Sequence, residues 1–388
     1  MSGVFNDPSP WMDEELMMFS DSIARALADI APEARVAKWR EDGIVERAAW
    51  NEAASAGMLG LSVAPEYGGA GGDFRHEAVL LRQLGRTGLD GWGIPLHNGI
   101  CAAYIGKYGT EEQRQRWLPR IVSGDLITAI AMTEPGAGSD LQGIRTSARR
   151  SGDGYAITGQ KTFITNGQHA DLVIVVAKTD PAAGSRGVSL LVVETADCPG
   201  FKRGRNLDKI GMELGDTSEL FFDDVQVPSG NLLGGEEGQG LYQLMKELPK
   251  ERLIIGVECL ALIEAALDHT LAYVRERKAF GKRVLDFQNT QFVLADCKTE
   301  AEVARTFIDD SIVRLGRGEL DAARASMAKY WVSEKAQRIV DACQQMFGGY
   351  GYMSEYPIAQ LYKDVRVKRI YGGTTEIMKV LIARTLEA

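Results

Sequence analysis

The sequence changes from helical to β-type patterns at Leu126-Ile127-Thr128-Ala129-Ile130-Ala131-Met132-Thr133-Glu134-Pro135-Gly136-Ala137-Gly138-Ser139-Asp140. The first part of this stretch, Leu126 to Met132, is an apolar run typical of a buried strand. The second part consists of small and hydroxylated residues, which let backbone N–H groups approach a ligand closely and add side-chain donors. From these residues alone, a plain turn and a ligand-binding loop are both open interpretations.

Residues 127–232 contain short β-branched and aromatic runs that Gly, Asn, Asp and Pro separate. This spacing predicts an antiparallel barrel or sandwich. The block shows no βαβ alternation, and no GxGxxG follows a strand, so a Rossmann dinucleotide domain is not predicted. The predicted strands are Tyr155–Thr158, Leu172–Ala177, Val188–Val193 and Glu219–Val227.

The sequence on the N-terminal side of this block is predicted to be helical. Apolar residues recur at helix-like spacing in Glu14–Ile30 and Glu112–Ile121, and less clearly in Asn51–Leu59. The glycine-rich run Ala64–Gly72 predicts a loop between them.

On the C-terminal side, from about residue 238, apolar residues repeat every three or four positions through a long helix that includes Leu253 and Val274. Additional apolar residues outside that stripe predict burial on more than one side. Further helices are predicted at Phe287–Leu315, Leu320–Phe347 and Ile377–Leu386. We therefore expect an α+β multi-domain chain, with a helical domain over 1–126, a β domain over 127–236 and a helical domain over 237–388.

Composition limits the function classes. The 388 residues have a formal net charge of −9, which argues against a nucleic-acid-binding surface. No run approaches ~20 apolar residues, so no integral membrane segment is predicted. Met1–Glu15 lacks the features of a signal or transit peptide, and the five cysteines are widely spaced, which predicts a cytoplasmic protein. Scattered histidines and the lack of CxxC or HExxH predict no metal site.

Further motifs carry groups suited to a planar, anionic cofactor. In Lys161–Gly167, Phe163 and Thr165 share one face of a predicted strand, where a ring could stack and a hydroxyl could bond. An ordinary strand end is the alternative. Arg277-Lys278-Ala279-Phe280-Gly281-Lys282 with Gln288 has a solvated helix end as its alternative. The remaining motifs are Gln345-Met346-Phe347-Gly348-Gly349 and Arg369-Ile370-Tyr371-Gly372-Gly373-Thr374-Thr375-Glu376-Ile377.

These five motifs, in this order, resemble the acyl-CoA dehydrogenase family, and the resemblance extends from about residue 15 to the end. The runs at 247–253 and 371–379 look like the long-chain type. The resemblance implies a C-terminal four-helix bundle and FAD bound non-covalently between the β domain and the C-terminal helices. Flavin contacts are implied at Ile130, Met132, Thr133, Ser139, Phe163, Thr165, Arg277, Phe280, Gln288, Gln345, Gly348, Gly349, Thr374 and Glu376.

The resemblance also implies an acyl-CoA substrate, an electron-transfer flavoprotein as electron acceptor, and a homotetramer. In the family, Arg277 and the Gln345 segment reach the FAD of a neighbouring subunit. Phe163 stands where many relatives have Trp, so an aromatic wall is kept and an indole donor is lost. Contacts with the CoA thioester are implied at Ser139, Ser185, Arg186, Tyr242, Arg252, Gly372 and Gly373.

The catalytic pair implied by the resemblance is Glu251 and Gly372. Gly372 lacks the carboxylate that relatives carry there, whereas Glu251 supplies one on the long helix. Removing the α-proton of a thioester needs a positioned base, and apolar surroundings raise the proton affinity of a carboxylate toward the working pH. Gly372 keeps a backbone N–H that can stabilise the thioester oxygen.

Three other carboxylates on the same predicted helix, Glu247, Glu258 and Glu264, are rivals of Glu251. A solvated or salt-bridged surface residue is the ordinary interpretation of any of them. Pro249 is expected to kink or start the helix just before Glu251.

The function that follows is FAD-dependent α,β-dehydrogenation of a fatty acyl-CoA to a trans-2-enoyl-CoA. Three alternatives stay open: a branched-chain or terpenoid acyl-CoA dehydrogenase, an O₂-using flavin oxidase or monooxygenase on the same fold, and a non-catalytic acyl-CoA-binding scaffold. Gly91–His97 is expected to contribute to the floor of the acyl-tail site, with His97 as a structural or pocket-lining group.

Overall fold

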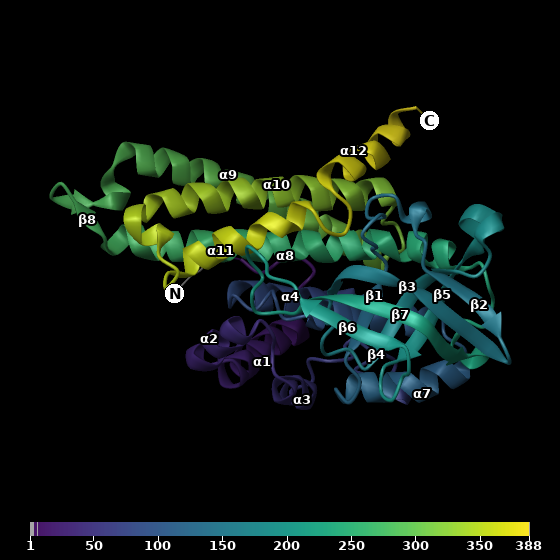
Figure 1. Cartoon of the computed structure of the whole chain (residues 1–388). Coiled ribbons are helices and arrows are strands. Elements are labelled where there is room, and N and C mark those ends of the chain that lie inside the picture. Colours follow the sequence, from purple (N-terminus) through teal and green to yellow (C-terminus); the bar gives the residue numbers. More distant parts are fainter. Residues whose placement is uncertain (1–3, 6, 388) are drawn as a thin grey trace.

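A computed structural model describes residues 4–5 and 7–387, which form a helical block, a sheet and a second helical block (Figure 1). In Figure 1 the sheet lies at the right, the first helices lie below, and the long C-terminal helices cross the top. The predicted α+β multi-domain class is confirmed. The prediction for Met1–Glu15 rests partly on residues 1–3 and 6, which lie outside the described residues.

The N-terminal helices begin at capped positions. Asp13 accepts a hydrogen bond from the Leu16 N–H at the start of the first helix, and Thr110 forms a capping box with Gln113 at the last. The predicted helix Asn51–Leu59 lies further upstream than expected, and the predicted loop Ala64–Gly72 contains a short 3₁₀ turn. The bounds are α1 (Glu14–Ile30), α2 (Glu33–Asp42), α3 (Arg47–Ser55), α4 (Phe74–Arg86), α5 (Ile94–Leu96), a π-helical turn (His97–Ala102), α6 (Ala103–Tyr108) and α7 (Glu111–Val122).

A seven-stranded sheet follows, in the order β1-β4-β2-β3-β7-β6, with β5 paired to β4. Most pairs are antiparallel as predicted, but β1 pairs with β4 in parallel, and so does one residue pair of β2 with β4. The middle block is therefore a mixed sheet rather than a wholly antiparallel one. The bounds are β1 (Thr128–Ala131), β2 (Ser147–Ser151), β3 (Gly154–Thr165), β4 (Leu172–Lys178), β5 (Val188–Glu194), β6 (Phe201–Asn206) and β7 (Thr217–Pro228).

The C-terminal block consists of long helices and a small hairpin. Pro249 lies inside the first of them, which begins at Gly240. Of the two expected roles of Pro249, a helix start is therefore wrong, and a kink stays a prediction. The bounds are α8 (Gly240–Glu276), β8 (Lys278–Ala279), β9 (Lys282–Arg283), α9 (Gln288–Gly316), α10 (Ala322–Met346), α11 (Pro357–Val365) and α12 (Thr375–Ala383).

Helix α8 joins the three blocks. It packs against α4 of the first block, β5 of the sheet, and α9, α10 and α11 of its own block. This confirms the prediction that it is buried on more than one side. At about 55 Å for 37 residues, the helix extends from the sheet to the β8–β9 hairpin at the opposite end (Figure 1). None of the described helices combines the length and apolar composition that a membrane crossing requires.

Candidate active site

Glu251 lies on α8 with its side chain turned into the protein, and the residue is 6% exposed. Its Oε1 accepts a hydrogen bond of 2.9 Å from the hydroxyl of Tyr104, which is itself fully buried on α6. Burial raises the pKa of Glu251 to about 7, although the Tyr104 hydrogen bond acts in the opposite direction. The structure therefore gives this carboxyl group a proton affinity suited to a general base near neutral pH.

The three rival carboxylates of α8 all bind a cation. Glu247 accepts from Lys107, and Glu264 pairs with Arg82 at 2.8 Å. Glu258 accepts from Lys368, which is fully buried. Among these four glutamates, Glu251 is the one with no cation among its described hydrogen-bond partners. This difference favours Glu251 as the base, because an ion-paired carboxylate has a reduced proton affinity.

Gly372 lies next to the same stretch of α8. Its φ is +62°, and a Cβ built on it would lie 2.3 Å from Cδ1 of Ile255, one helical turn beyond Glu251. A side chain at position 372 would therefore meet backbone strain and would require the terminal methyl group of Ile255 to shift. The Gly372 N–H donates to none of the described residues, and the glycine is exposed. The position can thus offer a backbone donor, and its positive φ favours glycine.

A buried lysine holds the loop of Gly372 and Gly373. Nζ of Lys329 on α10 donates to the Gly373 carbonyl at 2.6 Å, and Lys329 is fully buried. Burial lowers the pKa of Lys329 to about 8. The next residue, Thr374, caps α12 by accepting from the Ile377 N–H. Glu376 is exposed in the first turn of that helix.

Arg252 follows Glu251 and is 6% exposed. Its Nε has no hydrogen-bond partner among the described residues, and its Nη1 makes a long contact of 3.4 Å with the Ser326 hydroxyl. A buried guanidinium with an unused donor is suited to an acceptor from outside the chain.

Phe163 and Thr165 lie at the end of β3 as predicted, and Phe163 has an unusual conformation. It has a φ of +59° and is 67% exposed, within a register shift between Lys161 and Ile164. Holding a large aromatic residue in the left-handed region costs about 1–3 kcal/mol. A bulge that presents a strained, exposed aromatic ring fits a planar ligand, as the predicted flavin contact requires.

Hydrogen bonds from Lys161 hold the turn after β1 in place. Its buried Nζ donates to the Met132 carbonyl at 3.0 Å and to Oε1 of Glu134 at 2.9 Å. Glu134 also accepts from the N–H groups of Arg145 and Thr146. Glu134 therefore fixes the turn, whereas Ser139 is exposed and Met132 and Thr133 are partly exposed. Ile130, the other predicted contact on β1, is 6% exposed.

The other predicted flavin residues lie at the opposite end of α8, by the β8–β9 hairpin (Figure 1). Arg277 caps α8 and stacks over Tyr350 at 5.5 Å. Phe280 has a φ of +51° and is 95% exposed. Gln288, Gln345, Gly348 and Gly349 are exposed at the same end. Within one chain, this second set therefore lies far from Phe163 and Thr165.

Of the predicted CoA contacts, Ser185 and Arg186 lie in a short exposed turn between β4 and β5, Pro181–Gly187. This turn contacts α8, where Tyr242 is 58% exposed on the first turn of the helix. The structure therefore places these three side chains on neighbouring elements.

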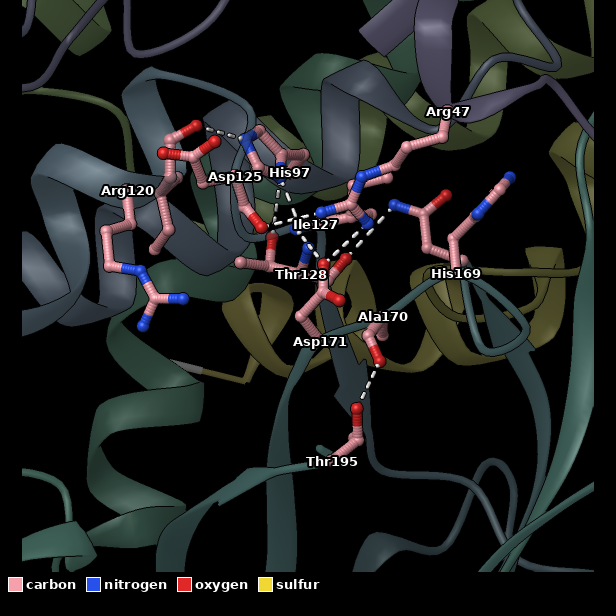
Figure 2. Close-up of polar contacts among 12 residues, drawn as sticks. Arg47, His97, Arg120, Asp125, Ile127, Thr128, His169, Ala170, Asp171 and Thr195 are labelled. Atoms are coloured by element: carbon pink, nitrogen blue, oxygen red, sulfur yellow. Dashed lines mark hydrogen bonds and ion pairs between the residues drawn. The ribbon is translucent and has the colours of Figure 1, made fainter. Parts of the chain in front are cut away.

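His97 is a structural residue. Its Nδ1 accepts from the Thr128 N–H at 3.3 Å, and its Nε2 lies 3.1 Å from the Ile121 carbonyl. Burial lowers the pKa of His97 to about 4, so the ring is neutral. Figure 2 shows His97 beside Thr128, and near them Asp171 bonded to Arg47, which ties the first block to the sheet. With both ring nitrogens engaged, His97 has none left for a substrate.

Three residues of the site were not predicted from the sequence: Tyr104, Lys161 and Lys329. Tyr104 meets Glu251 across 147 residues of sequence, and Lys329 reaches Gly373 across 44. No local spacing reports such contacts. For Lys161 the sequence did offer a signal, because a lysine inside an apolar strand pattern needs a partner when it is buried.

The chain is similar over most of its length to known proteins. Models of the acyl-CoA dehydrogenase N-terminal, middle and C-terminal domains match residues 13–125, 129–225 and 238–387. The chain is 48% identical over 351 residues to the mitochondrial long-chain specific acyl-CoA dehydrogenase of Rattus norvegicus, covering 90% of this chain and 81% of that protein. It is 33% identical over 381 residues to the mitochondrial isovaleryl-CoA dehydrogenase of Pongo abelii, with coverage of 97% and 90%.

A crystal structure of an acyl-CoA dehydrogenase from Geobacillus kaustophilus superimposes with a TM-score of 0.95 at 47% identity, covering 98% of this chain and all of that one. All three domain models match in the order and span expected of one family member. The chain belongs to the acyl-CoA dehydrogenase family.

Proposed function

We propose that the chain catalyses the α,β-dehydrogenation of a fatty acyl-CoA thioester to the trans-2-enoyl-CoA, with electrons passing from FAD to an electron-transfer flavoprotein. The observation that carries this proposal is the burial of Glu251 and the hydrogen bonding of its carboxyl group. This group is buried, has no cation bound to it among the described residues, and lies beside the Gly372 loop.

The role of Glu251 is to remove the α-proton. The Cα–H bond breaks, and its proton moves to the carboxylate while the electron pair stays on the substrate. A hydrogen leaves Cβ as hydride, and the double bond forms between the two carbons. Because burial raises the pKa of Glu251 to about 7, the carboxylate is basic enough to take part and still largely ionised above neutral pH.

The role of Gly372 is to stabilise the charge that develops on the thioester oxygen. Its N–H has no acceptor among the described residues, and its position is fixed by Lys329 through the Gly373 carbonyl. A donor that is held in place before the reaction needs no reorganisation when the charge appears. Arg252, Ser139, Ser185, Arg186 and Tyr242 are the proposed CoA contacts.

The cofactor of the family is FAD, and residues at the end of β3 fit it: Phe163 offers an exposed ring and Thr165 a hydroxyl on the same strand. When bound, the flavin supplies the hydride acceptor. The other predicted flavin residues lie near the hairpin end of α8, too far from β3 to join that set within one chain: Arg277, Phe280, Gln288, Gln345, Gly348 and Gly349. We therefore propose that a second subunit supplies them, in a homotetramer. A cytoplasmic location stays a prediction.

The decisive test is Glu251→Gln, which keeps the shape of the side chain and removes its basicity. We expect FAD content and acyl-CoA binding to persist, while the rate of flavin reduction falls at least ~10²-fold. Stopped-flow absorbance under anaerobic conditions measures the reduction. Glu264→Gln, on the same helix and bound to Arg82, is the matched control and should reduce at nearly the normal rate. Unchanged reduction in Glu251→Gln would refute the proposal.

Two further measurements decide between variants of this function. Bleaching of the flavin by acyl-CoA, followed by slow reoxidation in air, supports a dehydrogenase, whereas rapid peroxide release identifies an oxidase. A steady-state comparison of straight, branched and terpenoid acyl-CoA thioesters assigns the chain type. The similarity to both a long-chain enzyme and an isovaleryl-CoA enzyme makes this comparison necessary.

A further inference from the structure

The two oxygens of the Glu251 carboxyl group have different surroundings. Oε1 accepts the Tyr104 hydroxyl at 2.9 Å, whereas Oε2 accepts no hydrogen bond from any residue that the structure describes. Tyr104 is fully buried on α6, and its ring packs against that of Tyr108 at 6.0 Å. The hydroxyl is therefore held in place, and its bond to Oε1 leaves Oε2 as the oxygen that can meet a substrate carbon.

A second carboxylate lies one helical turn before the first. Glu247 shares a face of α8 with Glu251, because residues four apart lie one above the other. Its Oε1 accepts the Lys107 ammonium and the Tyr108 hydroxyl, each at 2.6 Å. The Glu247 side chain is 8% exposed, and that of Lys107 is 57% exposed. The ion pair thus has a buried carboxylate near Glu251 and an ammonium group that reaches solvent.

A cavity of about 330 Å³ borders this ion pair. Glu247, Lys107 and Lys250 line it, together with Tyr67 and apolar residues of α6 and α7. Water that enters this cavity reaches Glu247 directly. Glu247 consequently has both Lys107 and solvent as partners, although it lies close to a buried group.

We propose that Tyr104 is the positioning residue of Glu251 and that the Lys107–Glu247 pair sets the pH range over which Glu251 accepts a proton. This inference rests on the proposed function, in which Glu251 is the base. Tyr104 donates to the ionised carboxylate and favours it. Glu247 places a like charge nearby and favours the protonated form.

Other charged groups face Glu251 as well. Lys250 and Arg252, its neighbours on α8, lower the pKa of Glu251, as does Tyr104, whereas burial and Glu247 raise it. Cys101, from the π-helical turn, is a neutral thiol because burial raises its pKa to about 12. The balance of these groups can be tested because Tyr104 and Glu247 act in opposite directions.

The experiment follows anaerobic flavin reduction by acyl-CoA between pH 5.5 and 9 in the FAD-loaded enzyme. Tyr104→Phe should raise the midpoint pH of the reduction rate by roughly 0.5 to 1, because the carboxylate loses a donor. Glu247→Gln should lower the midpoint by a similar amount, because a like charge is removed. Tyr155→Phe is the matched control, since it removes another partly buried tyrosine hydroxyl that donates to a carboxylate. That hydroxyl donates to Glu237 at 2.6 Å. Its midpoint should equal that of the wild type.

A second readout does not depend on hydride transfer. An acyl-CoA analogue with sulfur in place of Cβ can lose its α-proton but not a hydride. Exchange of that proton with D₂O, measured by mass spectrometry, should show the same opposed shifts in Tyr104→Phe and Glu247→Gln. A residue with a merely structural role would lower the exchange rate at every pH and leave the midpoint unchanged.

The outcomes separate this inference from the proposed function. If Glu251→Gln abolishes reduction while both variants keep the wild-type midpoint, the proposed function stands and the inference is wrong. Shifts in the same direction would also overturn it. A Tyr104→Phe chain that fails to fold, when Glu251→Gln folds, would contradict a role for Tyr104 that operates through Glu251. If Glu251→Gln is fully active, the proposed function itself fails.

Discussion

At the scale of single residues, the proposed role of Glu251 conflicts with the stability of the folded protein. This carboxyl group is 6% exposed and has no cation bound to it among the described residues. Burial therefore destabilises its ionised form and raises its proton affinity. Its neighbours Glu247, Glu258 and Glu264 on the same helix each have a cation instead. Among the described residues, three of these carboxylates are compensated by ion pairs, and the one at the proposed site of reaction is not.

This conflict predicts a pH-dependent gain in stability for Glu251→Gln. The pKa of Glu251 is raised from 4.5 to about 7 in the folded protein, so the native state binds the proton more tightly than the unfolded chain. The wild type therefore loses stability as pH rises from about 4.5 to about 7, by roughly 3 kcal/mol at most. Glutamine has no such loss. The melting temperature of Glu251→Gln relative to wild type, at saturating FAD, should increase from pH 5 to pH 8.

Glu264→Gln serves as the comparison, because it breaks an ion pair with Arg82 and should destabilise the protein throughout this pH range. A difference between Glu251→Gln and wild type that is the same at pH 5 and pH 8 would contradict the proposed burial of an uncompensated carboxyl group.

The residues of the site differ in how far sequence could predict them. Glu251 and Gly372 were assigned through motifs whose residue types match a known family. Tyr104 was not, because its contact with Glu251 spans 147 residues and depends on how α6 packs against α8. The obstruction by Ile255 at position 372 has the same origin, since a glycine in a sequence shows neither its φ nor the atoms around it.

At the scale of elements, apolar strands were predicted and polar ones were missed. Strand β2 is Ser-Ala-Arg-Arg-Ser and β6 is Phe-Lys-Arg-Gly-Arg-Asn, and most of their side chains face solvent. Period-two patterns are weak in such short, basic segments. The parallel pairing of β1 with β4 was missed as well, because pairing partners are set by tertiary contacts rather than by local composition.

The turn between β1 and β2 gives a prediction at this scale. Lys161 from β3 is the buried cation that holds Glu134 and the Met132 carbonyl. Lys161→Met would leave Glu134 buried with backbone donors alone, which costs about 3–5 kcal/mol for a broken buried pair. We expect a lower melting temperature and at least ~10-fold weaker FAD binding. A loss of about 1.4 kcal/mol in the binding free energy at the turn already raises the Kd for FAD tenfold.

FAD titration by fluorescence quenching measures this loss. Lys202→Met, at an exposed lysine of β6, is the matched control and should bind FAD normally. If Lys161→Met binds FAD as tightly as the control, the turn does not need its brace and Glu134 has another role.

At the scale of the whole molecule, the two sets of predicted flavin residues lie at opposite ends of α8 (Figure 1). The end with the β8–β9 hairpin exposes several large aromatic side chains: Phe280 is 95% exposed, Tyr352 85% and Phe292 60%. Such a concentration of exposed aromatic surface is typical of an interaction site rather than of a free surface. We propose another copy of the chain, which carries the complementary set at Phe163, as the partner that would complete both sites.

Phe280→Asp tests this assembly. Burying an aromatic side chain contributes about 1.5–3 kcal/mol, and a charge at the centre of an interface opposes association further. We expect the variant to elute as a species smaller than a tetramer in size-exclusion chromatography with light scattering, and to lose most of its FAD. Met18→Asp on α1, which changes another exposed apolar residue (65% exposed), should keep both the wild-type mass and the flavin. A Phe280→Asp protein that retains the mass and FAD content of the control would show that each chain binds its flavin alone, and the division of the site between subunits would be wrong.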